Sequence, residues 1–433
     1  MSESTESSTP SGGGAAVIPD SPAGPQQRVS WVFIAALCGA YFLFMCALLG
    51  PGIVGLAIKV QSIVPAAEKA PALGVVSAFS AVVATLSNVI FGRISDRTTW
   101  RFGRRRPWIV IGTVAMGVGL LGTALSPTVP ILIVTWCVVQ FGANVALSPF
   151  NAILADFVPH EQRGAVAALK GIAINLAVMS GTYMAKFFTD NLVALFFGPA
   201  VLAFVAVVAY AWYLPEKQLT LKPPKATFKE ILSTFYFNPV KFPDFGWAWL
   251  SRFTMQLSTY MFTTFRLFYM QDEIGLTTKD AAAAIATGVL IYTLISIPAS
   301  YISGKLSDVM GRRKIFVLAA SIIFGAGTVL LFNVNTVMGF YMVEAILGLA
   351  YGIYLGVDLA LVIDVLPDPR NPGKDLGVFN IANALPNAAA PLIGAQMLAI
   401  ASPDSKNYAA LVIASGVIAI VGGFAITLIK KVR

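Results

Sequence analysis

The sequence predicts an all-α polytopic membrane protein with twelve membrane-spanning helices. Of its 433 residues 57% are hydrophobic and only 12% are charged, with a mean hydropathy of +0.76, whereas about a quarter of a soluble domain is charged. The apolar residues form long runs, and the charges gather in short segments between them. Because charged side chains are costly in hydrocarbon, this arrangement is typical of helices joined by short polar loops. It excludes a soluble globular enzyme.

Twelve apolar runs are long enough to cross a bilayer, since a helix needs about 20 residues to do so. Several contain Gly or Pro, which membrane helices tolerate. The predicted spans are 31–56, 72–92, 107–126, 130–152, 165–187, 193–214, 244–270, 281–303, 314–333, 337–362, 375–398 and 408–429.

The loop between the second and third spans is the most strongly charged part of the chain. Residues 92–107 read G-R-I-S-D-R-T-T-W-R-F-G-R-R-R-P, with six arginines beside the single carboxylate of Asp96. Arginine-rich short loops stay in the cytoplasm. Such a loop alone could be only a topology signal. However, a shorter copy, G-K-L-S-D-V-M-G-R-R-K, recurs at 304–314, with Asp308 in the position of Asp96.

The distribution of positive charge predicts that both termini are cytoplasmic. With the 92–107 loop inside, 22 of the 30 lysines and arginines lie on the inner side, five lie outside and three lie within spans. This bias is the usual determinant of orientation, and we expect a multi-pass protein of the cell membrane. The net charge of +9 is then explained by topology and anionic lipid, without nucleic acid as a partner.

The two halves of the chain repeat each other. Asp96 and Asp308 are 212 residues apart, and A-D-F-V-P at 155–159 precedes I-D-V-L-P at 363–367 by 208. We therefore expect two pseudo-symmetric six-helix bundles, 30–215 and 244–433, joined by a cytoplasmic linker at 216–243. Residues 1–29, rich in Ser, Gly and Pro, are expected to form a disordered cytoplasmic tail and not a signal peptide.

No pattern for catalysis, metal binding or a cofactor is present. The cysteines at 38, 46 and 137 lie inside apolar runs, and His160 has no partner motif. H-E-x-x-H, G-x-S-x-G and a phosphate loop are all missing. The sequence thus predicts a protein that is not an enzyme and has no metal or cofactor. A non-transporting receptor or a membrane enzyme remains an alternative without supporting residues.

Polar side chains recur on single faces of several spans. Their spacings of four, seven, eight, eleven or fourteen residues place them on one helix face, as a hydrophilic substrate would need. Amides can instead join helices to one another, but an unpaired charge in hydrocarbon is expensive. These residues are Gln140, Asn144 and Asn151; Arg252, Gln256 and Tyr260; Glu344, Tyr351 and Asp358; and Tyr41 in the first span.

The two charged loops resemble the signature loops of the major facilitator superfamily of transporters, which join helices 2 and 3 and, in a weaker copy, helices 8 and 9. The resemblance implies two parallel six-helix repeats with the substrate at their interface. Helices 1, 4, 7 and 10 would then line the cavity. It implies substrate binding by Tyr41, Gln140, Asn144, Asn151, Gln256, Tyr260 and Tyr351.

The same resemblance implies a conformational latch at the cytoplasmic ends of the helices. Asp96 would contact the start of the eleventh span at Lys374–Gly377, and Asp308 would face the start of the fifth near Gly164. Both contacts would hold the cytoplasmic side shut in the outward-facing state. Asp156 and Asp364 are expected to pair with the loop arginines. The predicted latch residues are Gly92, Asp96, Arg97, Arg101, Gly103, Arg104, Arg105, Asp156, Arg163, Gly304, Asp308, Gly311, Arg312, Arg313 and Asp364.

Three patches resemble plant sucrose–proton symporters and the bacterial glycoside–pentoside–hexuronide cation symporters. They are R-F-G-R-R-R-P-W at 101–108, N-A-I-L-A-D at 151–156 and L-G-V-F-N-I-A-N-A-L-P at 376–386. The resemblance implies proton-coupled symport of a disaccharide or glycoside. Two positions depart from the family, since Gln140 stands where the symporters have an aspartate and Asn151 where they have an arginine. The helix 1 acids of melibiose-type sodium symporters are also missing, which favours protons over sodium.

Gln140 cannot carry a proton, so a coupling site must lie elsewhere. We predict Asp358 for this role, with Arg252 as its partner, since desolvation and a nearby cation act on such an acid in opposite directions. A permanent structural ion pair is the alternative, and Glu344 is the rival site. Lys170 is expected to snorkel or to pair with an acid, and a role in substrate binding is less favoured.

Proton-driven efflux of drugs or metabolites is the alternative function. That branch usually carries G-x-x-x-G-P-x-x-G-G in helix 5, whereas the fifth span here reads G-I-A-I-N-L-A-V-M-S-G without the Pro. The predicted partners are a small-molecule substrate, protons and the lipid bilayer, and we expect a monomer.

Overall fold

The computed structural model describes residues 28–216, 238–367 and 372–431. Within them the chain is all-α, with long helices and no strand. Every predicted span corresponds to a helix or, for the first span, to one helical segment that continues through a turn. The limits proposed for the tail and the linker fall largely on residues outside the described ranges, so the domain boundaries stay a prediction.

The first half of the chain forms six spans. Its first span is interrupted at Pro51, which has no backbone N–H to donate, and the helix passes through one turn of π-helix, Pro51–Gly55, before it resumes. Bulges of this kind are frequent at functional sites. The helices are α1 (Trp31–Gly50), α2 (Leu56–Gln61), α3 (Lys69–Asp96), α4 (Arg106–Leu125), α5 (Val129–Phe157), α6 (His160–Phe187) and α7 (Leu192–Tyr213).

The second half forms another six. Four of these are apolar and long enough to count as membrane spans on length and hydropathy, as are all six spans of the first half. The other two, α9 and α13, contain charged and amide side chains, and α13 also has two internal prolines. At 30 and 28 residues they are nevertheless long enough to cross a bilayer. The helices are α9 (Pro243–Asp272), α10 (Thr278–Met310), α11 (Arg313–Leu330), α12 (Val337–Asp364), α13 (Pro372–Ala399) and α14 (Tyr408–Ala425).

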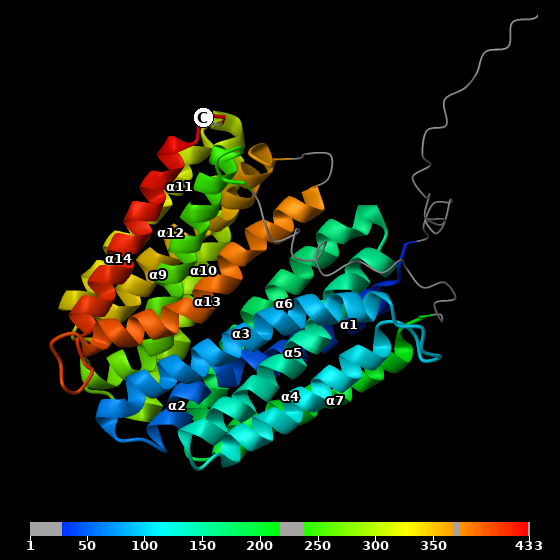
Figure 1. The fold of residues 1–433 in the computed structure, drawn as a ribbon, viewed down its shortest axis with the longest axis horizontal. Coiled ribbons are helices and arrows are strands. Elements are labelled where there is room, and N and C mark those ends of the chain that lie inside the picture. Colours follow the sequence, from blue (N-terminus) through cyan, green and yellow to red (C-terminus); the bar gives the residue numbers. More distant parts are fainter. Residues whose placement is uncertain (1–27, 217–237, 368–371, 432–433) are drawn as a thin grey trace, which may run out of the picture.

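The helices pack as two bundles, one from each half. In the first bundle α3 and α4 both pack on α5, and in the second bundle α10 and α11 both pack on α12. The main contacts between bundles are α3 with α13 and α6 with α10. Figure 1 shows the blue-to-green first half and the green-to-red second half side by side, with α13 and α3 between them. The chain is therefore a multi-pass membrane protein of two six-helix bundles.

Close contact of α1 with α6 depends on two glycines. A Cβ atom added to Gly181 would lie 2.2 Å from the Cα atom of Gly50. Without a side chain at either position the two backbones can touch, which is how helices gain packing energy where no hydrophobic effect drives them together. Gly171, on the same helix α6, has open space at its Cβ position.

We expect Gly181→Leu to lower the free energy of unfolding by about 1–3 kcal/mol or more, because an inserted side chain must push α6 away from α1. Gly171→Leu is the matched control on the same helix and should leave the melting temperature of the purified protein nearly unchanged. Equal melting temperatures for the two variants would show that the contact of α1 with α6 does not limit stability.

Candidate functional site

A cavity of about 420 Å³ lies between the two bundles. Its wall comes from α1 and the π-turn, α2, α3 and α5 of the first half and from α9 and α13 of the second. Part of the wall is apolar, and the rest carries amides, hydroxyls and two large aromatic rings. The polar and aromatic members are Ser77, Ser80, Trp136, Gln140, Asn144, Tyr260, Thr263, Thr264 and Asn387.

Three of the predicted substrate-binding residues line this cavity, namely Gln140, Asn144 and Tyr260. The remaining four, Tyr41, Asn151, Gln256 and Tyr351, are not part of its wall. Tyr41 and Gln256 are buried between helices. The hydroxyl group of Tyr351 donates to the Gln256 carboxamide oxygen at 3.2 Å, which links α12 to α9.

Asn144 contacts both the cavity and the neighbouring helix. Its side-chain oxygen accepts an N–H from Asn88 of α3 at 3.1 Å, and its side-chain nitrogen donates to the Gln140 carbonyl at 2.9 Å. The amide therefore joins two helices and also presents a polar surface to the cavity. Asn88 was not among the predicted site residues.

Several cavity residues were missed from the sequence. Trp136 lies four residues before Gln140, and Thr264 lies four residues after Tyr260, so extending the polar stripes by one turn would have found both. Ser77, Ser80 and Asn387 belong to α3 and α13, helices that were not expected to line the cavity.

The polar stripe of α12 faces α9 and not the cavity, which corrects the expectation for that span. Asp358 pairs with Arg252 at 2.9 Å, and Glu344 pairs with Arg266 at 2.9 Å. The two helices run antiparallel, and in each the two partners are fourteen residues apart. The pairing of Arg252 with Asp358 is confirmed. Arg266 was missed, although its spacing of fourteen residues from Arg252 matches that of the two acids.

The Arg252–Asp358 pair also contacts α13. The Arg252 Nε atom donates to the Asn383 side-chain oxygen at 2.9 Å, and the guanidinium lies 4.6 Å from the centre of the Phe379 ring. The side chains of Arg252 and Asp358 are 17% and 6% exposed. Three helices of the second bundle thus meet at one ion pair.

The two charged loops form matching ion-pair clusters at one end of the molecule, which we call the arginine-rich end. In the first half, Arg105 bridges Asp96 at 2.6 Å and Asp156 at 2.9 Å, and Arg104 adds a second contact to Asp156 at 2.6 Å. In the second half, Arg313 bridges Asp308 at 3.1 Å and Asp364 at 2.5 Å. The expected pairing of the two helix-end acids with loop arginines is confirmed.

Two different structural features account for the four glycines in and beside these loops. Gly103 and Gly311 have φ of +104° and +61°, a region that side chains disfavour. Gly92 and Gly304 stand where α3 meets Ser148 of α5 and where α10 meets α12.

The Glu216 carboxylate accepts the backbone N–H groups of residues 105 and 106, at 2.7 and 3.0 Å, and so caps the start of α4.

The other predicted latch arginines have different surroundings. Arg101 lies over its neighbour Phe102, with its guanidinium 4.8 Å from the ring centre, and Arg163 donates to the Val158 carbonyl at 2.9 Å. Arg312 is exposed and Arg97 is half-buried. Asp96 pairs within its own half, and its side chain is 53% exposed. Its contact with the start of α13 therefore stays a prediction for the outward-facing state, in which the cytoplasmic side would be shut.

Polar contacts join the two bundles at the opposite end. Lys69 of α3 pairs with Asp272 of α9 at 2.7 Å, and both side chains are nearly buried, at 9% and 12% exposure. The Tyr408 hydroxyl donates to the same carboxylate at 2.6 Å. Gln61 donates to Thr278 at 3.2 Å nearby.

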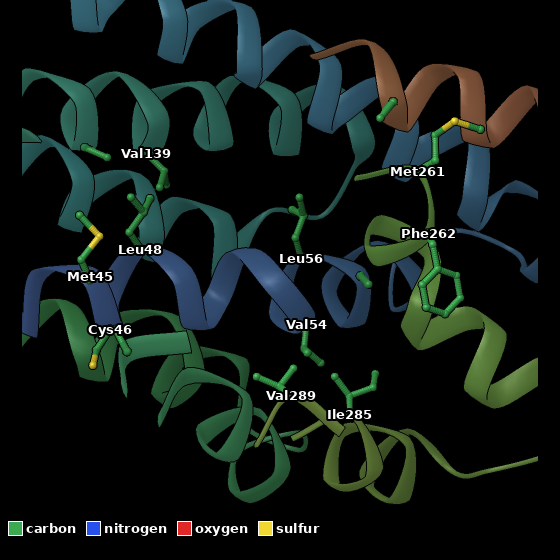
Figure 2. Packing of buried hydrophobic residues seen from close by; sticks show 14 of the residues in the cluster. Met45, Cys46, Leu48, Val54, Leu56, Val139, Met261, Phe262, Ile285 and Val289 are labelled. Carbon is green, nitrogen blue, oxygen red and sulfur yellow. The ribbon is translucent and has the colours of Figure 1, made fainter. Parts of the chain in front are cut away.

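Apolar packing accompanies these contacts. Figure 2 shows Val54 of the π-turn pointing toward Ile285 and Val289 of α10, within one buried cluster. A Cβ atom on Gly74 of α3 would lie 2.8 Å from the Pro391 carbonyl oxygen of α13. The two bundles are therefore in direct contact at the end opposite the arginine-rich loops.

Among the described residues Lys170 has no acidic partner, and its side chain is buried instead of snorkelling, which corrects that expectation. The residue is 7% exposed. Its Nζ atom donates to the Asn151 side-chain oxygen at 2.8 Å and lies 4.2 Å from the centre of the Tyr41 ring.

Two curated proteins resemble parts of the chain. An uncharacterized MFS-type transporter of Methanocaldococcus jannaschii is 28% identical over 146 residues, which is 34% of this chain and 36% of the relative. Multidrug resistance protein 3 of Bacillus subtilis is 30% identical over 124 residues, which is 29% of this chain and 22% of the relative. The matched part thus spans about a third and about a fifth of these relatives' lengths.

Solved transporter structures share the fold over nearly the whole chain. A bacterial homolog of the human lysosomal transporter Spinster, in an inward-facing and unoccupied conformation, aligns with a TM-score of 0.69 and 14% identity, over 92% of this chain and 96% of that one. The nucleoside transporter NupG, as a mutant, gives 0.73 and 13%, over 92% and 100%. The model of the Major Facilitator Superfamily matches residues 32–391 and, in a second match, 281–433. This chain belongs to the Major Facilitator Superfamily.

Proposed function

We propose that this membrane transporter couples the uptake of a sugar, a disaccharide or a glycoside, to protons by alternating access. The observation that carries the proposal is the cavity between the bundles, whose wall combines amides and hydroxyls with two aromatic rings. Sugars present hydroxyl groups to hydrogen-bonding side chains and apolar ring faces to aromatic ones. The volume of about 420 Å³ lies within the usual range for small-molecule sites.

Alternating access is supported by where the bundles touch. Lys69, Gln61 and their partners join them at the end opposite the arginine-rich loops, whereas the loop carboxylates at the arginine-rich end pair within their own halves. We propose that the arginine-rich end is cytoplasmic, because short loops rich in Lys and Arg stay inside, and that the cavity opens to that side here.

Proton coupling is proposed for Asp358. It is a buried carboxylate whose partner, Arg252, is also held by Asn383 of α13, a helix that reaches the cavity and the other bundle. A movement of α13 would change the hydrogen bonding of the guanidinium and hence its hold on the acid. An acid whose environment changes between states can load and release a proton.

Efflux is a second candidate, favoured by the similarity over 124 residues to Multidrug resistance protein 3. The two functions predict different results in an expressing strain and in proteoliposomes. An exporter would change the drug sensitivity of an expressing strain, whereas a sugar symporter would exchange labelled disaccharide in proteoliposomes.

The first test is counterflow of labelled disaccharide in proteoliposomes, with Asn144→Leu as the diagnostic variant. Removing a buried amide that binds substrate costs about 1–3 kcal/mol, so the substrate dissociation constant should rise roughly 5- to 150-fold.

Asn88→Leu is the matched control, because it removes the same interhelical hydrogen bond while leaving Asn144 in the cavity wall. Its substrate affinity should stay close to that of the unaltered protein. If both variants lose affinity equally, Asn144 acts only by joining α3 to α5. If no disaccharide is exchanged, the sugar assignment is wrong.

The second test concerns coupling. Asp358→Asn should abolish accumulation driven by a pH gradient while counterflow continues, because exchange of substrate does not require net proton movement.

Glu344→Gln is the comparison, since it breaks the neighbouring ion pair of the same two helices. Glu344→Gln leaves the buried Arg266 without its carboxylate, and Asp358→Asn does the same to the largely covered Arg252. Both variants should therefore be destabilised, by up to about 3–5 kcal/mol, but only Asp358→Asn should lose coupling. Accumulation that remains dependent on the pH gradient in Asp358→Asn would move the coupling site to Glu344.

The third test measures the contact between the bundles. Lys69→Met should shift the population away from the state in which the end opposite the arginine-rich loops is closed, because it removes from the Asp272 carboxylate the nearer of its two cations and the one that belongs to the other bundle. Distances between spin labels on the two bundles would report this shift.

Lys406→Met is the control, since Lys406 contacts the same carboxylate at 3.5 Å but is 40% exposed. Exposed pairs contribute about 0–1 kcal/mol, so this variant should keep the original distance distribution. Identical distributions for both lysine variants would mean that the ion pair does not hold that end closed.

A further inference from the structure

Five cationic side chains are buried in the described part of the chain: Lys59, Lys69, Arg105, Lys170 and Arg266. Three of them pair with carboxylates, namely Lys69 with Asp272, Arg105 with two acids and Arg266 with Glu344. This is the expected rule, because a buried charge is tolerated when it is paired. Lys59 and Lys170 lack a carboxylate partner within the described ranges, and their surroundings differ.

Lys59 is compensated by the end of a helix. Its Nζ atom donates to the Ala124 carbonyl at 2.8 Å, and that carbonyl belongs to the last turn of α4, which ends at Leu125. The C-terminal end of a helix carries about half a negative charge. The cation therefore has a permanent partner of opposite sign.

Lys170 has only neutral partners. Its Nζ atom donates to the Asn151 oxygen at 2.8 Å, lies 3.5 Å from the Phe150 carbonyl and faces the Tyr41 ring at 4.2 Å. Phe150 and Asn151 lie inside α5, which continues to Phe157, so this carbonyl is not at a helix end. A cation–π contact and an amide oxygen attract the ammonium group without neutralising it.

Of the three residues that contact the Lys170 ammonium, Tyr41 and Phe150 are buried and Asn151 is exposed. The spacing of Asn151 from Gln140 and Asn144 places it on the face of α5 that carries these two cavity residues, although Asn151 itself is not part of the cavity wall. It lies nearer than they do to the arginine-rich end. An acceptor on a ligand in this region could replace or join the amide oxygen on the ammonium, which has three protons to donate.

We propose that Lys170, together with Asn151, binds an anionic group of the transported solute, a carboxylate or a phosphate. The proposal rests on the proposed function only in taking the solute to pass between the bundles. An anion would supply the missing opposite charge, and its charge-assisted hydrogen bond is stronger than the one Asn151 provides. The site therefore selects anionic over neutral solutes of the same shape.

The test uses the full-length protein and a matched set of probes. They are methyl β-D-glucoside, its uronate and its 6-phosphate, together with acetate and inorganic phosphate as anions without a sugar. Dissociation constants come from ligand-dependent thermal stability. We expect the uronate or the 6-phosphate to bind at least about tenfold more tightly than the neutral glucoside, a difference of about 1.4 kcal/mol.

Three variants test which residues cause the preference for anionic over neutral glucosides. Lys170→Met should remove it, and Lys59→Met, which replaces a buried lysine that has a helix-end partner, should keep it. Asn151→Asp places a carboxylate beside the ammonium in nearly the same shape, so the anion preference should disappear while the protein remains at least as stable. Loss of preference in this variant therefore cannot come from misfolding.

The outcomes separate this site from the sugar assignment. If the neutral glucoside binds and its anionic derivatives bind no more tightly, the anion site is wrong and the sugar function stands. If no glucoside binds but phosphate or acetate stabilises the protein only when Lys170 is present, the anion site stands and the sugar function is wrong. A preference that persists in both Lys170→Met and Asn151→Asp would overturn the site, and so would binding of none of the five probes.

Discussion

The high cost of an unpaired charge in hydrocarbon organises this protein. Arg252 with Asp358 and Arg266 with Glu344 bring four ionisable groups into the second bundle, where each member of a pair depends on its partner to be tolerated. Because the partners are fourteen residues apart on both helices, α9 and α12 can pair them only in one antiparallel register. A slip of one turn would leave four charges without partners. The ion pairs therefore specify how these two helices pack, whatever their net contribution to stability.

The same constraint distinguishes the ion pairs within each bundle, which can persist when the bundles move, from the ion pair between the bundles, which must break. At the arginine-rich end, Arg105 and Arg313 each join two carboxylates on neighbouring helices of their own half, so each bundle can move as a rigid body. Lys69 and Asp272 instead join the two halves. In the alternating access that we propose, this pair must separate and be solvated at every cycle, which makes it part of the balance between the two states.

Polar groups without a full set of partners then mark the places where a ligand can contribute. The cavity amide of Asn144 has a neighbour in α3 but still faces open space. Lys170 has its hydrogen bond and its ring contact but no opposite charge in the described residues. Both lie on or beside the same face of α5, so a solute between the bundles would meet an amide-lined pocket and a cation along one helix.

Hydropathy and charge alone predicted the helical spans and the fold class, because local composition decides which segments can enter a bilayer. The pairing of the loop acids with arginines was expected from the resemblance of the two charged loops to the superfamily's signature loops. Arg252 was also predicted to pair with Asp358, because both residues lie toward the same side of one half of the chain. Helical phase cannot say which neighbour a polar face meets, so the stripe of α12 was assigned to the cavity although it contacts α9. The contributions of α3 and α13 to the cavity, and the neutral surroundings of Lys170, depend on how tilted helices pack across the bundles. Only the tertiary structure decides this, because side chains far apart in the sequence supply or withhold the partner that each buried charge requires.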